Sequence, residues 1–345
     1  MGPRVGASGA GRHHSDRANG GASRLLAALA GLLAFAACAP LELPAGPAVT
    51  EPALEPAALV MADGARLLLR VWAPEGPPRA VVLALHGFND YSNAFDAPAR
   101  SLADRGVVTY AYDQRGFGAN PDPGLWPGAA TLALDARTAL GLVMRRHEGV
   151  PVYVLGESMG GAVALLALAD AGAPKLAGVV LVAPALWGWS TLNPLYRATL
   201  WLTAHVAPGA KFTGKNLGVQ ASDNVEMLIA LGKDPLFIKA TRADAIYGIV
   251  HLMDDALAAP LPVGVPLLVL YGAHDEIIPP KPTRRFARRL GAGQRFAYYA
   301  DGWHMLLRDL GAGAVYDDLL AWLDDRGAAL PSGADGAAER FVAEP

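Results

Sequence analysis

The residues best suited to chemistry stand in one short stretch, VYVLGESMGGAVALL, which covers residues 152–166. An apolar segment leads into Ser158 and another leads out of it, which predicts a buried strand followed at once by a helix. Gly156 and Gly160 flank the serine because side chains there would collide with neighbouring backbone. The pattern predicts a strained turn that holds the Ser158 hydroxyl above the carboxyl edge of a sheet. A glycine-rich turn with a purely structural serine is the alternative.

A serine nucleophile needs a base to take its proton and a carboxylate to orient that base. Where the serine stands on such a turn, the acid and then the base follow it along the chain. Asp275 comes just after the apolar run PLLVLYG, and His304 comes just after a further expected strand, QRFAYYA. We therefore predict that Ser158 is the nucleophile, Asp275 the orienting acid and His304 the base.

Other histidines and carboxylates follow the serine but are weaker candidates for these roles. They are His205, His251, His274, Glu276 and Asp301. The first two fall in an expected helical insertion and are expected to be surface or lining residues, and the third is expected to be a loop residue. Glu276 points elsewhere if its neighbour Asp275 points inward, and Asp301 is too close to His304 in sequence to be the first choice.

The negative charge that develops on a substrate carbonyl oxygen needs two backbone N–H donors. The N–H of Met159 lies at the start of the helix after Ser158 and points at the required space. The strand LALHGFND ends in His86, Gly87 and Phe88, and the loop after this strand supplies the second donor in this architecture. We predict Met159 and Phe88 as the two donors, and we expect His86 to orient the loop rather than to act as a base.

The scaffold that positions these residues is predicted by apolar runs that alternate with helical stretches. The expected buried strands are AVVLALHGF, VVTYAYD, PVYVLG, LAGVVLVAP, PLLVLYG and QRFAYYA. Helices are expected at 94–105, 131–147 and 159–171, and a hairpin turned at Asp63-Gly64 precedes them. Buried strands alternating with helices imply an α/β fold with a mostly parallel sheet covered on both faces.

One segment, residues 185–262, interrupts the alternation because it contains no clear buried strand. We expect it to be a helical cap inserted between two late strands. Its aromatic residues either form the core of the cap itself or line a tunnel for an acyl chain. The candidates for contact with substrate are Trp187, Trp189, Tyr196 and Trp201.

The length, charge and motif content of the chain exclude several classes of binding protein. The 345 residues suffice for one large or two small domains, and the net charge of −3 shows no polybasic footprint of the kind that nucleic acid requires. The glycines of DQRGFG lack a following G-K-[ST], so this stretch is expected to be a salt-bridged structural loop rather than a nucleotide site. No metal-ligand spacing such as H-E-x-x-H is present, and we expect no metal and no cofactor.

The first 38 residues are typical of an export signal. Arginines precede a short apolar run, Leu25–Cys38, which is shorter than the roughly 20 residues that span a bilayer. Ala36 and Ala37 stand before the only cysteine, and this ending resembles a bacterial lipobox, in which the cysteine is lipidated. We expect an exported protein anchored to a membrane through Cys38, facing the periplasm or the cell surface. An ordinary signal peptide with an incidental cysteine is the alternative.

The segments that flank the folded part are also predicted from composition. Residues 39–56 are rich in proline and alanine and are expected to form a tether. Residues 327–345 are rich in glycine and alanine and are expected to form a loose tail. The folded domain is then expected over residues 57–326.

Five blocks of the chain resemble those of the monoacylglycerol lipase and lysophospholipase group of serine α/β-hydrolases. They are HGFNDYS, DQRGFG, GESMGG, GAHDEIIPP and WHMLLRD. The resemblance covers residues 57–325 and implies the α/β-hydrolase fold, the triad and the two oxyanion donors named above. It also implies that the substrate is a lipid-like acyl ester, either a monoacylglycerol or a lysophospholipid. Hydrolysis of small esters, acyl transfer, peptide hydrolysis and a non-enzymatic surface binding module are the alternatives on the same fold.

Overall fold

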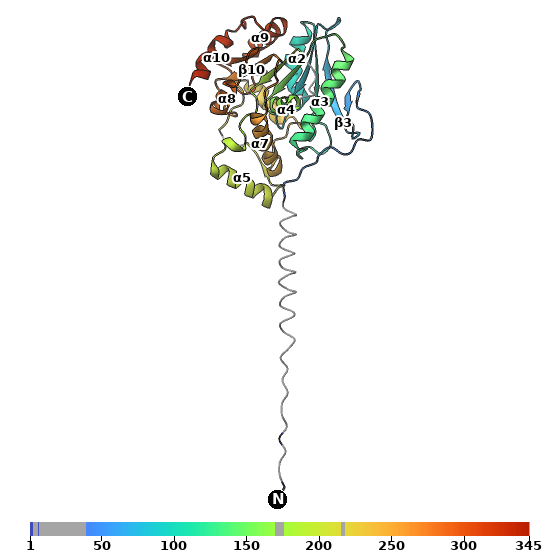
Figure 1. The fold of residues 1–345 in the computed structure, drawn as a ribbon, viewed down its shortest axis with the longest axis vertical. Helices are drawn as coiled ribbons and strands as arrows, with labels where there is room; N and C mark the ends of the chain where they lie inside the picture. Colours follow the sequence, from blue (N-terminus) through green and yellow to red (C-terminus); the bar gives the residue numbers. More distant parts are fainter. Residues whose placement is uncertain (3–5, 7–38, 170–175, 215–217, 345) are drawn as a thin grey trace.

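The computed structural model of the chain describes residues 1–2, 6, 39–169, 176–214 and 218–344. Within these residues, nine strands form one sheet (Figure 1). They are β1 (Ala53–Leu54), β2 (Ala58–Val60), β3 (Arg66–Trp72), β4 (Ala80–Leu85), β5 (Val107–Tyr112), β6 (Val152–Glu157), β7 (Gly178–Val182), β10 (Leu267–Gly272) and β11 (Gln294–Tyr299). Their order across the sheet is β1-β2-β3-β5-β4-β6-β7-β10-β11.

The sheet is antiparallel from β1 to β5 and parallel from β5 to β11. The expected hairpin is present, since β2 and β3 pair around the turn at Asp63 and Gly64. In the parallel part, the register pairs Leu85 with Gly156 and Gly272 with Tyr299. The carboxyl ends of β4, β6, β10 and β11 therefore meet at one edge, and each predicted triad residue and oxyanion donor follows one of these ends.

Helices cover both faces of the sheet. They are α2 (Asp96–Ala103), α3 (Ala129–Arg146), α4 (Met159–Leu168), α5 (Pro194–Val206), α6 (Val225–Lys233), α7 (Ala243–Ala258), α8 (Pro280–Ala287), α9 (Ala312–Asp324) and α10 (Ala334–Ala343). Helices α2 and α9 lie on one face, and α3, α4 and α7 lie on the other (Figure 1). Successive β4 residues point into opposite cores, with Leu83 on the α4 side and Val82 on the α2 side. The predicted mostly parallel, doubly covered sheet is confirmed.

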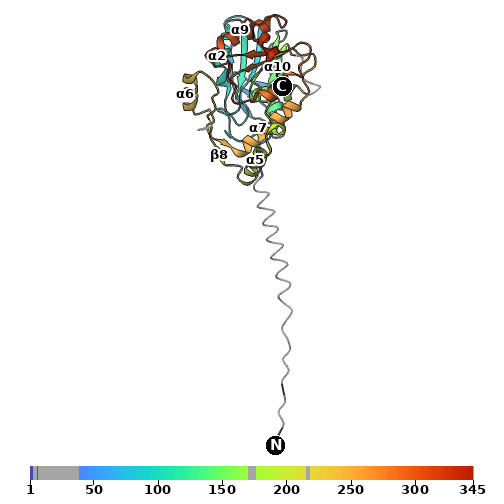
Figure 2. The ribbon, with the colours of Figure 1, turned by 90° about the vertical axis from the view of Figure 1, so that its left-hand side faces the viewer.

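The segment between β7 and β10 forms the predicted helical insertion. It contains α5, α6, α7 and a short antiparallel pair, β8 (Lys211–Phe212) with β9 (Thr241–Arg242). Helix α7 packs against α4 and belongs to the layer that covers the sheet. Helix α6 stands out at the side of the domain, and α5 and β8 lie at the lower end of the domain as drawn in Figure 2. The part of the insertion that projects from the domain is therefore smaller than residues 185–262.

The predicted tether is wrong for most of residues 39–56, which lie on the domain. Glu42 pairs with Trp126 in a parallel bridge, and the N–H of Leu43 donates to the Trp126 carbonyl at 2.9 Å. The N–H of Ala45 donates to the hydroxyl of Thr131 at 3.1 Å. Proline and alanine suit an extended segment that pairs with a buried loop as well as they suit a free linker, so composition did not separate the two.

The predicted loose tail is also wrong, because its last part is helix α10. Phe341 is 3% exposed and stacks on Phe296 and Tyr298 of the edge strand β11, with ring centroids 5.4 Å and 4.5 Å apart. Ala334, Ala338 and Phe341 form one buried stripe at helical spacing. The helix covers the edge of the sheet with this stripe, and the high glycine and alanine content of the segment concealed it.

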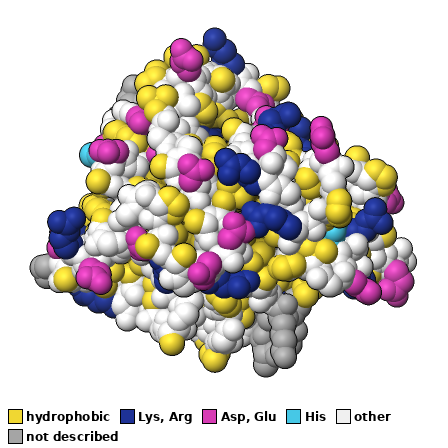
Figure 3. Space-filling model, turned by 90° about the horizontal axis from the view of Figure 1, so that it is seen from above, with side chains coloured by type: hydrophobic (Ala, Val, Ile, Leu, Met, Phe, Trp, Pro, Cys, Tyr) yellow, Lys and Arg dark blue, Asp and Glu magenta, His cyan; other side chains and the backbone are white. Residues whose placement is uncertain are grey.

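Most of the predicted export signal, including the predicted lipidation site Cys38, lies outside the described residues. Among the helices that the structure describes, none is both long and apolar enough to cross a bilayer. On the face of the molecule shown in Figure 3, acidic and basic side chains are interspersed, as the nearly balanced composition would suggest.

Candidate active site

Ser158 occupies a sharp turn between β6 and α4. Its backbone has φ 52° and ψ −115°, a conformation that non-glycine residues adopt at a cost of about 1–3 kcal/mol. A β carbon on Gly156 would lie 2.4 Å from the carbonyl oxygen of Gly160, and one on Gly160 would lie 1.9 Å from that of Leu85. Only glycine fits at either position, so the two glycines allow the strand and helix to approach closely enough to form the turn.

His304 and Asp275 form a buried pair at the same edge of the sheet. The distance from Nδ1 of His304 to Oδ2 of Asp275 is 2.9 Å. The other carboxylate oxygen, Oδ1, accepts the N–H groups of Ile277 and Ile278 at 2.9 Å and 2.8 Å. Two backbone donors therefore fix one oxygen of Asp275, which turns the other oxygen towards the imidazole.

Glycines bring the acid loop and the base loop together. A β carbon on Gly272, at the end of β10, would lie 2.4 Å from the carbonyl of Gly302. The N–H of His274 donates to that same carbonyl at 2.8 Å, and its ring stacks on Trp303. His274 is thus a loop residue, as the sequence predicted.

The other weaker candidates also lie apart from this pair. Glu276 points away and accepts the N–H of Gln220, while Asp301 is exposed. In the cap, the rings of His205 and His251 stack on tryptophans of the same segment.

The protonation of His304 is set by opposing influences. Burial alone lowers the pKa of the imidazole, but the charge and hydrogen bond of Asp275 more than offset it, so the pKa lies above the usual value of 6.5. Because Nδ1–H donates to Asp275, the neutral ring keeps Nε2 as a proton acceptor. His304 is therefore arranged to accept a proton from a hydroxyl on its Nε2 side.

The loop after β4 lies beside Ser158. A β carbon on Gly87 would be 3.4 Å from the β carbon of Ser158, so the loop passes the serine closely, with Phe88 next in the chain. His86 is buried, its Nε2 accepts the N–H of Gln114 at 2.9 Å and its Nδ1–H donates to the Gly87 carbonyl at 2.8 Å. His86 therefore orients this loop, as expected from the sequence, and burial lowers the pKa of its ring.

Met159 is the first residue of α4 and is fully buried. The first four N–H groups of a helix have no partner within the helix, so the Met159 N–H is available where Ser158 stands. A serine, an oriented imidazole, a loop N–H group at Phe88 and a helix N-terminal N–H group at Met159 thus share one edge of the sheet.

Comparison with known families gives this arrangement its context. A family model described as "Serine aminopeptidase, S33" matches residues 76–311. The chain belongs to this family. It is therefore a serine hydrolase with the α/β-hydrolase fold, as predicted, and Ser158, Asp275 and His304 all lie within the matched range.

The chain aligns with most of the length of several curated relatives. The chain is 27% identical to the monoacylglycerol lipase of Mycolicibacterium smegmatis over 267 residues, which is 75% of this chain and 93% of that protein. It is 26% identical to the human monoglyceride lipase over 282 residues, 78% of this chain and 90% of that protein.

Solved structures show the same fold. The monoacylglycerol lipase of Paleococcus ferrophilus superposes with a TM-score of 0.61 at 22% identity, covering 74% of this chain and 98% of that chain. A soluble variant of the Saccharomyces cerevisiae monoglyceride lipase, in complex with a substrate analogue, superposes with a TM-score of 0.66 at 19% identity, covering 84% and 99%.

In this member of the S33 family, Ser158 and His304 open into a cavity of about 590 Å³. Such a volume suits a small-molecule ligand. Much of the lining is apolar, and these residues are Phe88, Val219, Leu228, Leu231, Phe237, Ile238, Ile277 and Met305. Most of the apolar wall comes from cap residues 219–238, so the cap forms one side of the cavity beside the serine.

The four aromatic residues predicted to contact substrate do not line this cavity. Tyr196 and Trp201 are 54% and 47% exposed on α5, and Trp187 and Trp189 pack against the core on the α7 side. Trp189 stacks on His251 of α7, Trp201 stacks on His205 within α5, and the rings of His205 and Tyr247 join α5 to α7. Trp187 and Trp189 therefore fit the first alternative, a role in packing, whereas Tyr196 and Trp201 are half-exposed and fit neither a core role nor contact with substrate in this cavity.

The cavity residues that sequence reasoning missed lie on α6 and in the loop after it. The stretch VEMLIALGK of α6 is amphipathic, and Asn224 caps it by accepting the N–H of Met227 at 3.1 Å. This periodicity was a usable signal for Leu228 and Leu231, whereas the loop residues Phe237 and Ile238 have no local pattern.

The DQRGFG stretch is a salt-bridged loop, as expected. Arg115 bridges two aspartates, with Nη1 2.8 Å from Asp63 and Nε 2.6 Å from Asp135. The hydrogen bonds from Arg115 outweigh the effect of burial and hold the pKa of Asp63 at about 2. The loop ties the β2–β3 hairpin to α3 and is structural.

Proposed function

We propose that the chain is a serine esterase that hydrolyses acyl esters of lipids, with monoacylglycerol or lysophospholipid as its substrate class. One observation carries this proposal: the strained Ser158 and the oriented His304 face a cavity whose wall is largely apolar. The relatives named monoacylglycerol lipase and monoglyceride lipase support it, because they align over most of their own length.

The proposed reaction runs through an acyl-enzyme. Nε2 of His304 takes the proton of Ser158, whose oxygen attacks the ester carbonyl. The N–H groups of Phe88 and Met159 stabilise the oxyanion, and removing one such donor typically costs about 3–4 kcal/mol of barrier. His304 then gives its proton to the leaving alcohol and activates the water that releases the fatty acid. The Asp275 carboxylate stabilises the imidazolium throughout.

The family description also names aminopeptidases, so a peptide substrate is the second candidate. An aminopeptidase must bind the ammonium group of the peptide, which calls for an unpaired carboxylate. The carboxylates that line the cavity, Asp90 and Glu157, both pair with Arg308 and are each only 2% exposed, so neither is open to an ammonium group. The cavity therefore suits an uncharged acyl chain better than a charged amino terminus.

A substrate panel tests the proposal. Purified protein would be given monoacylglycerols, lysophospholipids, p-nitrophenyl esters and aminoacyl p-nitroanilides, and release of fatty acid or chromophore would be measured. We expect turnover of the acyl esters and none of the anilides. If the enzyme hydrolysed the anilides but not the long-chain esters, the proposal would be overturned in favour of a peptidase.

Acyl-chain length should control specificity. Because each buried CH₂ contributes about 0.8 kcal/mol, kcat/KM should rise roughly fourfold per CH₂ until the cavity is filled. The Leu228→Ser variant places a hydroxyl in the apolar wall and should flatten this rise, while acetate esters react at a rate within about twofold of wild type. Initial rates on p-nitrophenyl esters from acetate to palmitate would show this.

The matched control is Leu202→Ser, since Leu202 is 56% exposed on α5 and does not line the cavity. It should keep the wild-type dependence on chain length. A wild-type enzyme that prefers acetate to long chains would contradict the lipid assignment.

We also propose that the protein is exported and anchored in a membrane through a lipid on Cys38. The sequence supports this by its basic start, its short apolar run and the small residues before the cysteine. Two or more acyl chains on one cysteine suffice for stable anchoring, at about 0.8 kcal/mol per buried CH₂.

Full-length protein produced in a bacterium should sediment with membranes and incorporate labelled fatty acid. The Cys38→Ser variant should lose the label and leave the membrane fraction. Wild-type protein that is wholly soluble after export would instead indicate an ordinary signal peptide.

A further inference from the structure

A buried arginine connects the loops that carry the nucleophile, the base and the oxyanion donor. Arg308 lies four residues after His304, and its Nη2 is 3.2 Å from Oε2 of Glu157, the residue directly before Ser158. Its Nη1 is 2.8 Å from Oδ2 of Asp90, which lies two residues after Phe88. The guanidinium therefore contacts two segments of the active site, and its own residue belongs to a third, the loop of His304.

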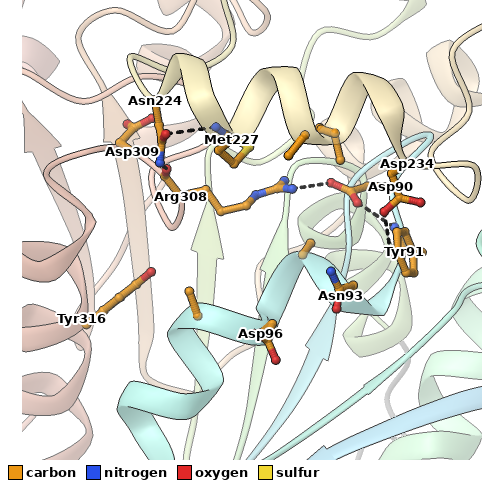
Figure 4. A pocket seen from close by; sticks show the side chains of 14 residues that line it. Asp90, Tyr91, Asn93, Asp96, Asn224, Met227, Asp234, Arg308, Asp309 and Tyr316 are labelled. Atoms are coloured by element: carbon orange, nitrogen blue, oxygen red, sulfur yellow. Dashed lines mark hydrogen bonds and ion pairs between the residues drawn. The ribbon is translucent and has the colours of Figure 1, made fainter.

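Packing alone does not hold this side chain in place. A second cavity of about 420 Å³ lies between α6 and α2, and Asp90, Leu231 and Arg308 line both this cavity and the one beside Ser158. Figure 4 shows the Arg308 side chain crossing the second cavity, with its guanidinium aimed at Asp90. Arg308 thus lines both cavities, and its two carboxylate partners hold its guanidinium there.

The charges in this cluster are unbalanced. Asp90 and Glu157 are each 2% exposed, and one arginine serves both. Oε1 of Glu157 is buried and has no hydrogen-bond partner among the residues that the structure describes. A bridge that only stabilised the fold would pair each buried charge and satisfy each buried oxygen. The surplus of negative charge next to His304 points to a role in the reaction.

We propose that Arg308 is a positioning residue for the hydrolytic reaction, holding the Ser158, His304 and Phe88 segments in register and balancing the negative charge around the imidazole. This inference rests on the proposed function, since it assumes that Ser158 and His304 react. Arg308 acts through these residues and has no contact with the reacting atoms in this role.

Several charged groups lie around His304. They are Asp275 after β10, Glu157 at the end of β6, Asp90 after β4, Arg308 and Asp309 on the loop of His304 itself, and Lys239 from the cap. Burial lowers the pKa of His304, Asp275 and Glu157 raise it, and Arg308 lowers it. Removing Arg308 should therefore raise the pKa of His304, and removing Glu157 should lower it.

The test measures the rate at which a fluorophosphonate probe labels Ser158 in the full chain, as a function of pH. Only neutral His304 can take the serine proton, so labelling falls as the pH falls through its pKa. In Arg308→Met, the acid limb should move up by about one pH unit, and labelling on the plateau should slow by about 10- to 100-fold. In Glu157→Gln the acid limb should move down, and the double variant should bring it back towards wild type.

Two further variants separate positioning from stability. Arg308→Lys keeps the charge but loses the two-pronged contact, so it should slow labelling while its acid limb stays in place. It also serves if Arg308→Met does not fold. Arg115→Met is the matched control, because Arg115 also bridges two carboxylates but lies outside the cavity. It should lower the melting temperature and leave the acid limb unchanged.

The inference would be overturned if the acid limbs coincided in all folded variants and labelling fell only in proportion to the unfolded fraction. Arg308 would then be a purely structural ion-pair residue. The opposite shifts in Arg308→Met and Glu157→Gln would establish it. Failure of the proposed function looks different: wild-type protein would not label at all, or would label but release no fatty acid from esters.

Discussion

The Ser158→Ala variant is expected to lose about 10⁶-fold in kcat, the effect of removing a triad nucleophile. The acyl-enzyme cannot form without the Ser158 oxygen, and the oxyanion donors at Phe88 and Met159 can then assist only a direct attack by water. The melting temperature should be preserved or raised, because the hydroxyl stands on a strained turn with φ 52°. Steady-state hydrolysis and a thermal melt on the same preparation check both parts.

The matched control is Ser101→Ala in α2, on the flank of the sheet and outside the cavity. It should keep wild-type kcat. Appreciable turnover by pure Ser158→Ala protein, above the level that contaminating host esterases explain, would refute Ser158 as the nucleophile.

The Asp275→Asn variant is expected to lose about 10⁴-fold in kcat. The N–H groups of Ile277 and Ile278 need an acceptor, so the amide oxygen should face them and the amide NH₂ should face Nδ1 of His304. That contact favours the tautomer with the proton on Nε2, which cannot accept the proton of Ser158. The pKa of His304 should also fall, because Asp275 raises it. The residual activity should therefore extend to lower pH than in wild type.

Two neighbouring carboxylates serve as controls for this variant. Glu276 and Asp301 are both exposed, and Glu276 accepts the N–H of Gln220, so Glu276→Gln and Asp301→Asn should each stay within about threefold of wild-type kcat, as changes outside the site do. If Asp301→Asn proved more damaging than Asp275→Asn, the acid of the triad would have been misassigned.

The sheet and the edge that carries the site could be predicted from sequence, because both depend on short patterns. A buried parallel strand is a continuous apolar run, and its carboxyl end is visible as the point where polar residues and glycine begin. Ser158, Asp275 and His304 each follow such an end. Parallel pairing places these ends at one edge, so residues up to 146 positions apart could be predicted to lie together.

The wall of the cavity and the Arg308 cluster could not be predicted in this way. Aromatic density in the cap is explained equally well by contact with substrate and by ring contacts within the cap itself, and only the structure separates the two. The ion pair between Arg308 and Glu157 joins residues 151 positions apart, with no local signature at either end. In α10, the buried stripe that ends at Phe341 was visible at helical spacing but was obscured by the surrounding glycine and alanine.

The attachment of Glu42 and Leu43 to Trp126 has a consequence for the proposed anchor. Only four peptide steps separate Cys38 from Glu42, and a fully extended chain covers at most about 14 Å in that distance. A lipid on Cys38 would therefore keep the catalytic domain close to the membrane surface, in contact with the lipid headgroups. Such an enzyme would meet its substrate by lateral diffusion within one leaflet. Its rate would follow the surface density of the lipid instead of the bulk concentration.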